Sequence, residues 1–262
     1  MTRIAIGQFY PTDSPVHRLD PRVKLLAVIA FVTVLLFVTR FLGLGLAALF
    51  LAAIIRLSRV PARFLFRGLR MILFILIFAS VINLFLTPGE TILFSFGFIR
   101  LTAEGLYRAG LMTVRLVLLV IGSSLLTLTT SPIKLTDGIE SLLRPFPLPA
   151  HDIAIMMTIA LRMIPTLAEE TDKIIKAQKA RGADFETGSL PKRVKQFLAV
   201  LIPLFVSSFK RADELATAME ARCYRGGEGR TKMKPLKMKR ADVLALAVTL
   251  LFCAGLIFLR FL

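Results

Sequence analysis

The stretch LLAVIAFVTVLLFVT, residues Leu25–Thr39, contains no charged side chain. About 20 apolar residues in a helix are enough to cross a bilayer, and a helix satisfies its backbone polar groups internally. The sequence therefore predicts a membrane span here, completed by a few flanking residues. Further uncharged runs follow at Phe41–Ile55, Met71–Thr87, Leu116–Ile133 and Val243–Leu259.

The composition supports a membrane protein. Hydrophobic residues make up 56% of the 262 residues, and the mean hydropathy is +0.73, which does not suit a soluble surface. The runs are continuously apolar, whereas barrel strands would alternate. We therefore expect an all-α membrane protein with about five transmembrane helices and long cytoplasmic helices. The exception is Thr91–Gly105, where we expect a short hairpin that turns at Gly97.

The chain is expected to divide into three regions. Residues 134–240 are too polar to span a membrane and too rich in Ile, Leu and Met for a disordered linker, so they should form packed cytoplasmic helices. Residues 1–133 form an N-terminal membrane region, and residues 241–262 form a last span. The four N-terminal spans are expected at about 23–39, 41–55, 71–87 and 108–131.

The distribution of Lys and Arg predicts the orientation, because cytoplasmic loops are enriched in both. Of the 34 basic residues, four precede the first span, five separate the second and third, and twenty lie in residues 134–240. These segments share one side of the membrane. We therefore expect a multi-pass protein of the cell membrane with a cytoplasmic N-terminus and no removable signal peptide.

The net charge of +17 does not indicate a nucleic-acid partner, because no recognition motif accompanies it and most basic residues adjoin apolar spans. Most of this charge is explained by the enrichment of Lys and Arg in cytoplasmic loops and by their attraction to anionic lipid head groups of the bilayer. Arg115 lies inside a predicted span and should face protein or extend to the interface. Cys223 and Cys253 should lie on opposite sides of the membrane, so we expect no disulfide.

Three helices are predicted in the cytoplasmic region, at Ile133–Leu143, His151–Arg181 and Lys192–Arg222. The first ends at the proline-rich RPFPLP. The second ends at Gly182, the residue type that most often takes the left-handed position after a helix. The third ends before the Gly226-Gly227 pair.

The last two helices resemble each other. Each has an apolar first half, a proline (Pro165 or Pro203) and a charged second half ending in Ala-Arg. One arginine at a helix end is explained by the helix dipole. The same ending on two matched helices, each ~45 Å long, favours docking onto a partner's carboxylates or carbonyls. At a spacing of 41 residues, Asp172, Ala177, Ala180 and Arg181 match Asp213, Ala218, Ala221 and Arg222.

Several segments resemble the EcfT family, the transmembrane coupling proteins of energy-coupling factor (ECF) transporters, to which the cobalt-dedicated CbiQ proteins are related. They are GQFYPTDSPVHRLDPRVKLLA at Gly7–Ala27, the two Ala-Arg motifs, and YRGGEGRTKMKPLKM at Tyr224–Met238. The resemblance covers essentially the whole chain. It implies an ABC-type importer of vitamins or metal ions, in which this subunit joins two cytoplasmic ATPases to a small membrane-embedded substrate-binding protein.

The resemblance also implies where the ATPases dock. One should contact Ala180, Arg181 and Gly182, and the other Ala221, Arg222 and Cys223. The second motif departs from Ala-Arg-Gly, so the contribution of Gly182 to its helix end should be supplied differently at Cys223, with Gly226 as the candidate.

We expect the apolar first halves of the two helices to form a platform for the substrate-binding protein, with Met156, Met157 and Phe205 facing outward. Pro165 and Pro203 each remove one backbone hydrogen bond, so they are candidate hinges. A fixed bend at each proline is the alternative.

No enzyme site is apparent in the sequence. It has no GxxxxGK[ST] motif, and His17 and His151 are far apart, so we expect no catalytic residue, cofactor or metal site in this chain. A membrane enzyme or autonomous channel would need polar residues in its spans, and these are scarce. Two transporter hypotheses remain: a coupling subunit shared by several vitamin-binding proteins, which the resemblance favours, and a dedicated cobalt or nickel permease of the CbiQ type.

Overall fold

The chain folds into two compact units. The bundle unit comprises residues 7–138 and 235–262, and the long-helix unit comprises residues 1–6 and 139–234. Within them, the computed structural model describes residues 9–86, 92–96, 99–146, 149–183, 185, 190–226 and 236–261.

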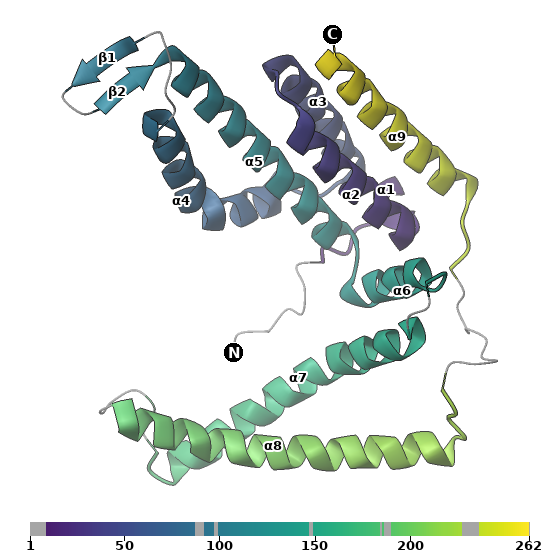
Figure 1. The fold of residues 1–262 in the computed structure, drawn as a ribbon. Helices are drawn as coiled ribbons and strands as arrows, with labels where there is room; N and C mark the ends of the chain where they lie inside the picture. Colours follow the sequence, from purple (N-terminus) through teal and green to yellow (C-terminus); the bar gives the residue numbers. More distant parts are fainter. Residues whose placement is uncertain are drawn as a thin grey trace. The chain divides into compact units, whose positions relative to one another are not determined.

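Helices dominate the bundle unit, as the sequence predicts (Figure 1). Proline begins three of them, α1, α2 and α6, because its fixed φ suits the first helical position, where no N–H partner is needed. The helices of this unit are α1 (Pro15–Arg18), α2 (Pro21–Phe37), α3 (Phe41–Ser58), α4 (Ala62–Leu86), α5 (Ala103–Thr129) and α9 (Arg240–Phe261), and α6 (Pro132–Leu143) begins in it.

By length and composition, the described helices α3, α5, α9 and α7 (Ala150–Ala180) could cross a membrane, and α4 is a fifth if its two arms form one span. The α4 arms, Ala62–Arg70 and Ile72–Leu84, meet at 58°. The bend lies where the third span is predicted to start, at about residue 71. The arm before it is basic, and the arm after it is apolar.

Two helices do not fit the prediction of five spans directly. Helix α2 has only 17 residues, or about 25 Å, so it needs flanking residues to cross a ~30 Å hydrocarbon core. Helix α7 is long enough, but its mean hydropathy of 1.2 is well below the 2.1 to 2.5 of α3, α5 and α9. The assignment of α7 to the cytoplasm stays a prediction.

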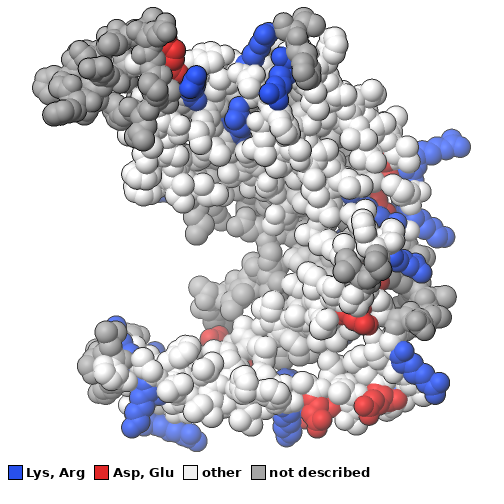
Figure 2. Space-filling view, in the orientation of Figure 1, with Lys and Arg blue, Asp and Glu red and all other residues white. Residues whose placement is uncertain are grey.

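The core of the bundle unit is formed where α2 packs against α5 and α9 and α3 packs against α5. Leu35 of α2 is fully buried there, and Phe50 of α3 stacks on Phe252 of α9 with ring centroids 4.1 Å apart. On the face seen in Figure 2, the described surface of this unit is largely uncharged, with basic residues near its edges. The buried core residues are Phe31, Val34, Leu35, Val38, Leu44, Ala47, Leu51, Leu111, Leu118, Leu125, Cys253 and Leu256.

A buried carboxylate joins the amino ends of α2 and α9. Asp242 accepts the backbone N–H of Asp20 at 2.8 Å through Oδ1 and that of Lys239 at 2.7 Å through Oδ2. Asp20 in turn caps α2 by accepting the N–H of Arg22 at 2.9 Å. Helix amino ends carry partial positive charge, so both carboxylates are favourably placed.

Two cations inside the bundle unit are held by backbone carbonyls. Lys24 donates to the carbonyls of His17 at 3.2 Å and Thr129 at 3.0 Å, and to the Thr130 hydroxyl at 3.4 Å. Arg115 donates to the carbonyl of Val38 at the carboxyl end of α2. Arg115 therefore faces protein, which is one of the two alternatives expected from the sequence.

The predicted hairpin is present between α4 and α5. Strands β1 (Ile92–Phe96) and β2 (Ile99–Thr102) pair antiparallel, with an irregularity between Ile92 and Phe94. Gly97, the predicted turn, lies outside the described residues. Thr102 then caps α5 by accepting the N–H of Gly105 at 3.1 Å.

Candidate functional site

The two long helices, α7 and α8 (Leu190–Ala221), run antiparallel (Figure 1). Glu170 of α7 accepts hydrogen bonds from Ser207 and, at 3.0 Å, from Arg211 of α8. Further along α7, Gln178 donates to the carbonyl of Ala199 at 3.3 Å. Residue numbers thus rise on one helix as they fall on the other.

This arrangement places the two Ala-Arg motifs at opposite ends of the pair. Arg181 follows directly on the Gln178 contact, whereas α8 continues from Ala199 for another ~33 Å before it reaches Arg222. The two guanidinium groups are therefore on the order of 30–40 Å apart. One small partner could not contact both.

The carboxyl end of α7 is closed by a Schellman motif, in which the residue after the cap is left-handed. Gly182 has φ 87° and donates to the carbonyl of Lys179 at 3.0 Å, and Ala183 donates to the carbonyl of Gln178 at 3.0 Å. Arg181 is the cap residue itself. The predicted role of Gly182 in ending this helix is confirmed.

The carboxyl end of α8 has the same motif, although a glycine is missing. Cys223 has φ 56° and donates to the carbonyl of Glu220 at 2.8 Å, and Tyr224 donates to the carbonyl of Met219 at 3.0 Å. The expectation that Gly226 replaces the missing glycine is wrong: Cys223 takes the left-handed conformation itself, and Gly226, which is also left-handed at φ 86°, lies three residues beyond it. A left-handed non-glycine residue costs roughly 1–2 kcal/mol.

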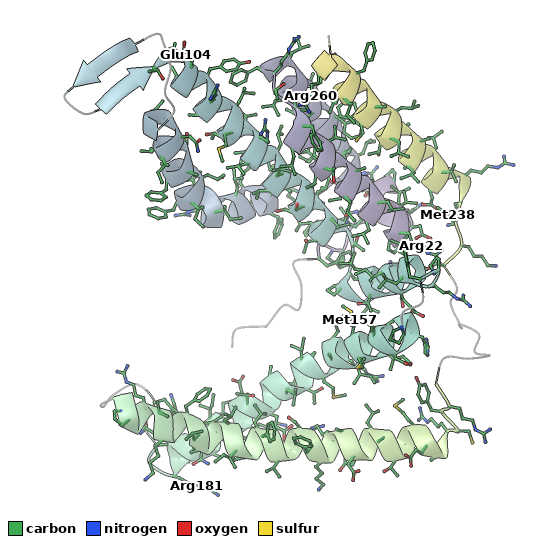
Figure 3. All side chains as sticks on the ribbon, in the orientation of Figure 1. Arg22, Glu104, Met157, Arg181, Met238 and Arg260 are labelled. Atoms are coloured by element: carbon green, nitrogen blue, oxygen red, sulfur yellow. The ribbon has the colours of Figure 1, made fainter. Side chains whose placement is uncertain are left out.

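Both arginines are presented outward, each by the same backbone geometry. Figure 3 shows Arg181 at the free end of α7, with its side chain directed away from the helix. Because the guanidinium is planar and permanently charged, each tip can bind a carboxylate or carbonyls on a partner. The six residues predicted to dock the ATPases are all exposed: Ala180, Arg181, Gly182, Ala221, Arg222 and Cys223.

The predicted platform residues are also exposed, by 60% at Met156, 39% at Met157 and 62% at Phe205. Their role in binding a partner stays a prediction. Other large apolar side chains share this exposure along α8, namely Val194, Phe197, Leu198, Leu201, Ile202, Val206 and Phe209. An apolar surface of this kind, on helices that also carry charged halves, commonly marks an interface.

Pro165 and Pro203 lie inside continuous helices, as predicted. The contacts of Glu170 and Gln178 between the helices were not expected from the sequence. They depend on the register of two antiparallel helices, which neither the apolar pattern nor the repeat specifies. On α8 these polar contacts lie on both sides of Pro203, at Ala199 and Ser207. Hinge motion at the two prolines stays a prediction.

Comparison with known proteins bears on the whole chain. The profile of the CbiQ family, described as cobalt transport protein, matches residues 12–233. The energy-coupling factor transporter transmembrane protein EcfT of Thermosediminibacter oceani is 51% identical over 264 residues, covering 100% of this chain and 99% of the relative. The EcfT proteins of Ruminiclostridium cellulolyticum and Bacillus subtilis are 51% and 45% identical, over 98% and 99% of this chain and 97% and 99% of theirs.

The chain belongs to the EcfT family. Membership places it in the membrane, in an energy-coupling factor transporter that contains other subunits. The EcfT relatives share about half of their residues with this chain and align over almost its whole length. The alternative hypothesis of a dedicated cobalt or nickel permease is therefore not favoured. The resemblance noted in the sequence is confirmed.

Proposed function

We propose that this EcfT-family chain is the coupling subunit of an ABC-type importer for vitamins or other micronutrients. It joins two cytoplasmic ATPases to a small membrane-embedded substrate-binding protein and transmits ATP-driven motion between them. ATP hydrolysis belongs to the partners, and this chain is not catalytic.

The observation that carries this proposal is the matched presentation of Arg181 and Arg222. Each caps a long helix that ends in a Schellman motif, each is exposed, and the two ends are too far apart for one docking groove. Two separate ATPases, each receiving one arginine, account for all three facts.

The proposed orientation has the N-terminus in the cytoplasm. Its support is the placement of the basic residues, twenty of which lie in residues 134–240. The same side then holds both arginine tips, where cytoplasmic ATPases can reach them. The exposed apolar faces that include Met156, Met157 and Phe205 are proposed to bind the substrate-binding protein.

Single and double arginine substitutions test the proposal in the assembled transporter. Arg181→Ala or Arg222→Ala should weaken one dock by on the order of 2–5 kcal/mol, because the partner's buried charge loses its ion pair. Transport and transport-linked ATP hydrolysis should both fall. Arg→Lys keeps the charge without the planar fork, so its effect should be intermediate.

The double substitution should give a folded membrane subunit that no longer co-purifies with the ATPases. Lys176→Ala and Arg225→Ala remove exposed charges near the same two ends and serve as matched controls, expected to retain both ATPases. If the double arginine variant still holds both ATPases and transports normally, the arginines are solvated helix caps and the proposal is wrong.

The hinge hypothesis has its own test. Pro165→Ala combined with Pro203→Ala restores two backbone N–H groups and should straighten the helices. If the prolines act as hinges, assembly is preserved and transport falls. Unchanged transport would mean that they only fix a static angle.

A further inference from the structure

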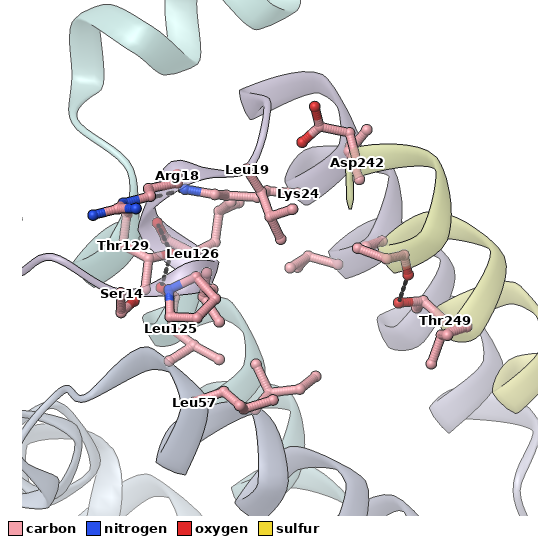
Figure 4. Close-up of a pocket in the computed structure, with 18 of the residues that line it drawn as sticks. Ser14, Arg18, Leu19, Lys24, Leu57, Leu125, Leu126, Thr129, Asp242 and Thr249 are labelled. Atoms are coloured by element: carbon pink, nitrogen blue, oxygen red, sulfur yellow. Dashed lines mark hydrogen bonds between the residues drawn. The ribbon is translucent and has the colours of Figure 1, made fainter. Parts of the chain in front are cut away.

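The bundle unit contains a cavity of about 960 Å³ lined by α1, α2, α3, α5 and α9. Figure 4 shows Arg18, Lys24 and Asp242 along one edge, with the apolar side chains of Leu125 and Leu57 below them. Most of the lining is apolar. Its deep wall is formed by side chains that are almost fully buried, among them Val23, Phe31, Leu51 and Leu125.

The cavity is open between α3 and α9. Lining residues at this opening are exposed on both helices: Ala53 and Leu57 on α3, and Leu244 and Val248 on α9. At the far end, the stacked rings of Phe50 and Phe252 bring the two helices together. The cavity is thus a groove with one closed end, facing outward between two predicted membrane spans, where lipid surrounds the protein.

The depth of the groove matches one leaflet. On α3 the groove runs from Arg59 at its mouth to Phe50 at its closed end, nine residues or about 13 Å along the helix axis. The hydrocarbon core of a bilayer is ~30 Å thick, so one leaflet contributes ~15 Å. Acyl chains entering from one interface would therefore fill the groove without crossing the midplane.

The mouth of the groove carries a positive charge. Its charged lining residues are Arg18, Lys24, Arg59 and Lys239 against Asp13 and Asp242. Asp242 is occupied by two backbone N–H groups, and Asp13 pairs with Arg18 at 3.2 Å. The hydrogen bond from Arg18 lowers the pKa of Asp13, so this pair remains ionised and nearly neutral. Arg59, which directly follows α3, and Lys239, which directly precedes α9, line the groove and are exposed.

From this combination we infer that the groove binds an anionic phospholipid, with its phosphate between Arg59 and Lys239 and its acyl chains between α3 and α9. Basic residues at the cytoplasmic mouth of an apolar groove between membrane helices suit such a head group. The buried Lys24 ammonium donates to three uncharged oxygens and interacts with the carboxylates of Asp242 and Asp20, so the contact with the phosphate rests on Arg59 and Lys239. The inference rests on the proposed orientation only for its choice of the cytoplasmic leaflet.

Native mass spectrometry of the full-length chain, titrated with phosphatidylglycerol or phosphatidylcholine, tests the head-group contact. Wild type should retain phosphatidylglycerol preferentially. The variant Arg59→Gln/Lys239→Gln should weaken that retention about 25-fold, since each basic residue near an anionic head group contributes a factor of about five. Arg56→Gln/Arg63→Gln removes two exposed charges outside the groove lining and should retain the lipid.

A second pair of variants tests the apolar groove. Ala53→Phe places an aromatic ring in the groove and should displace phosphatidylglycerol. Ala52→Phe adds the same ring at the neighbouring position, which is exposed but does not line the groove, and should leave phosphatidylglycerol bound. Equal retention of both lipids by wild type, or equal effects of the two Phe variants, would overturn the inference. So would loss of the substrate-binding protein with retention of lipid in Ala53→Phe, because the groove would then be a protein contact.

These outcomes are independent of the arginine tests. Loss of lipid with the ATPases still bound supports the lipid site, whatever happens at Arg181 and Arg222. Failure of ATPase docking with normal lipid retention would count against the proposed function alone.

Discussion

The side-chain amide of Gln178 on α7 donates to the carbonyl of Ala199 on α8, 3.3 Å away. In a regular helix that carbonyl would accept from the residue four positions later, which here is Pro203, and proline has no N–H. Gln178 therefore supplies the donor that Pro203 lacks. The bond connects the end of α7, three residues before Arg181, to the turn of α8 in which Pro203 removes a backbone hydrogen bond.

Removing this donor should destabilise the helix pair. Gln178→Leu keeps a similar volume but leaves the Ala199 carbonyl without its partner, at a cost of about 1 kcal/mol. Pro203→Ala restores an N–H to that carbonyl, so Gln178→Leu should cost much less in a Pro203→Ala background. Thermal unfolding of the four proteins in this double-mutant cycle measures the coupling. Additive effects would show that the Gln178 bond does not compensate for the N–H that Pro203 lacks.

The left-handed Cys223 predicts a stabilising substitution. Cys223→Gly removes the Cβ penalty at φ 56° and should stabilise the end of α8 by roughly 1 kcal/mol. Gly182→Ala introduces the same penalty at φ 87° and should destabilise the end of α7. Local hydrogen exchange at Tyr224 and Ala183 reports each end separately. Opposite signs are expected, and equal signs would contradict the shared motif.

The platform hypothesis predicts selective loss of one partner. A Glu at Met156, Met157 or Phe205 places a charge in an apolar contact, where desolvation opposes binding. Each change should release the substrate-binding protein and leave the ATPases bound, as judged by co-purification. Loss of both partners together would indicate misfolding. Retention of both would show that these exposed faces are not the interface.

A tight helix contact at Gly138 predicts a steric effect. A Cβ added there would lie 3.1 Å from Cβ of Pro21 at the start of α2. Gly138→Leu should therefore separate α6 from α2 and lower stability by about 1–3 kcal/mol, despite the better helix propensity of Leu. Gly255→Leu on α9 is the control, because nothing lies within 4 Å of its added Cβ. A thermal-shift assay should show a decrease only for Gly138→Leu.

The sequence predicts the helices well because their causes are local. Long apolar runs, the proline that begins α2, Pro149 before α7 and Gly182 after α7 each act on neighbouring residues, so the predicted and observed ends of α6, α7 and α8 nearly coincide. Contacts between distant residues carry no such local pattern. The Gln178–Ala199 bond needs the register of two helices, and the conformation of Cys223 needs the hydrogen bonds of the helix end to outweigh an unfavourable φ.

The carboxylate of Asp242 has a consequence for biosynthesis. It accepts the N–H of Asp20, 222 residues earlier in the chain. At the usual rate of translation, α2 is complete on the order of tens of seconds before α9 emerges. During that time the amino end of α2 lacks its partner and the face later covered by α9 is open. A nascent chain that stalls before residue 240 therefore leaves this face uncovered.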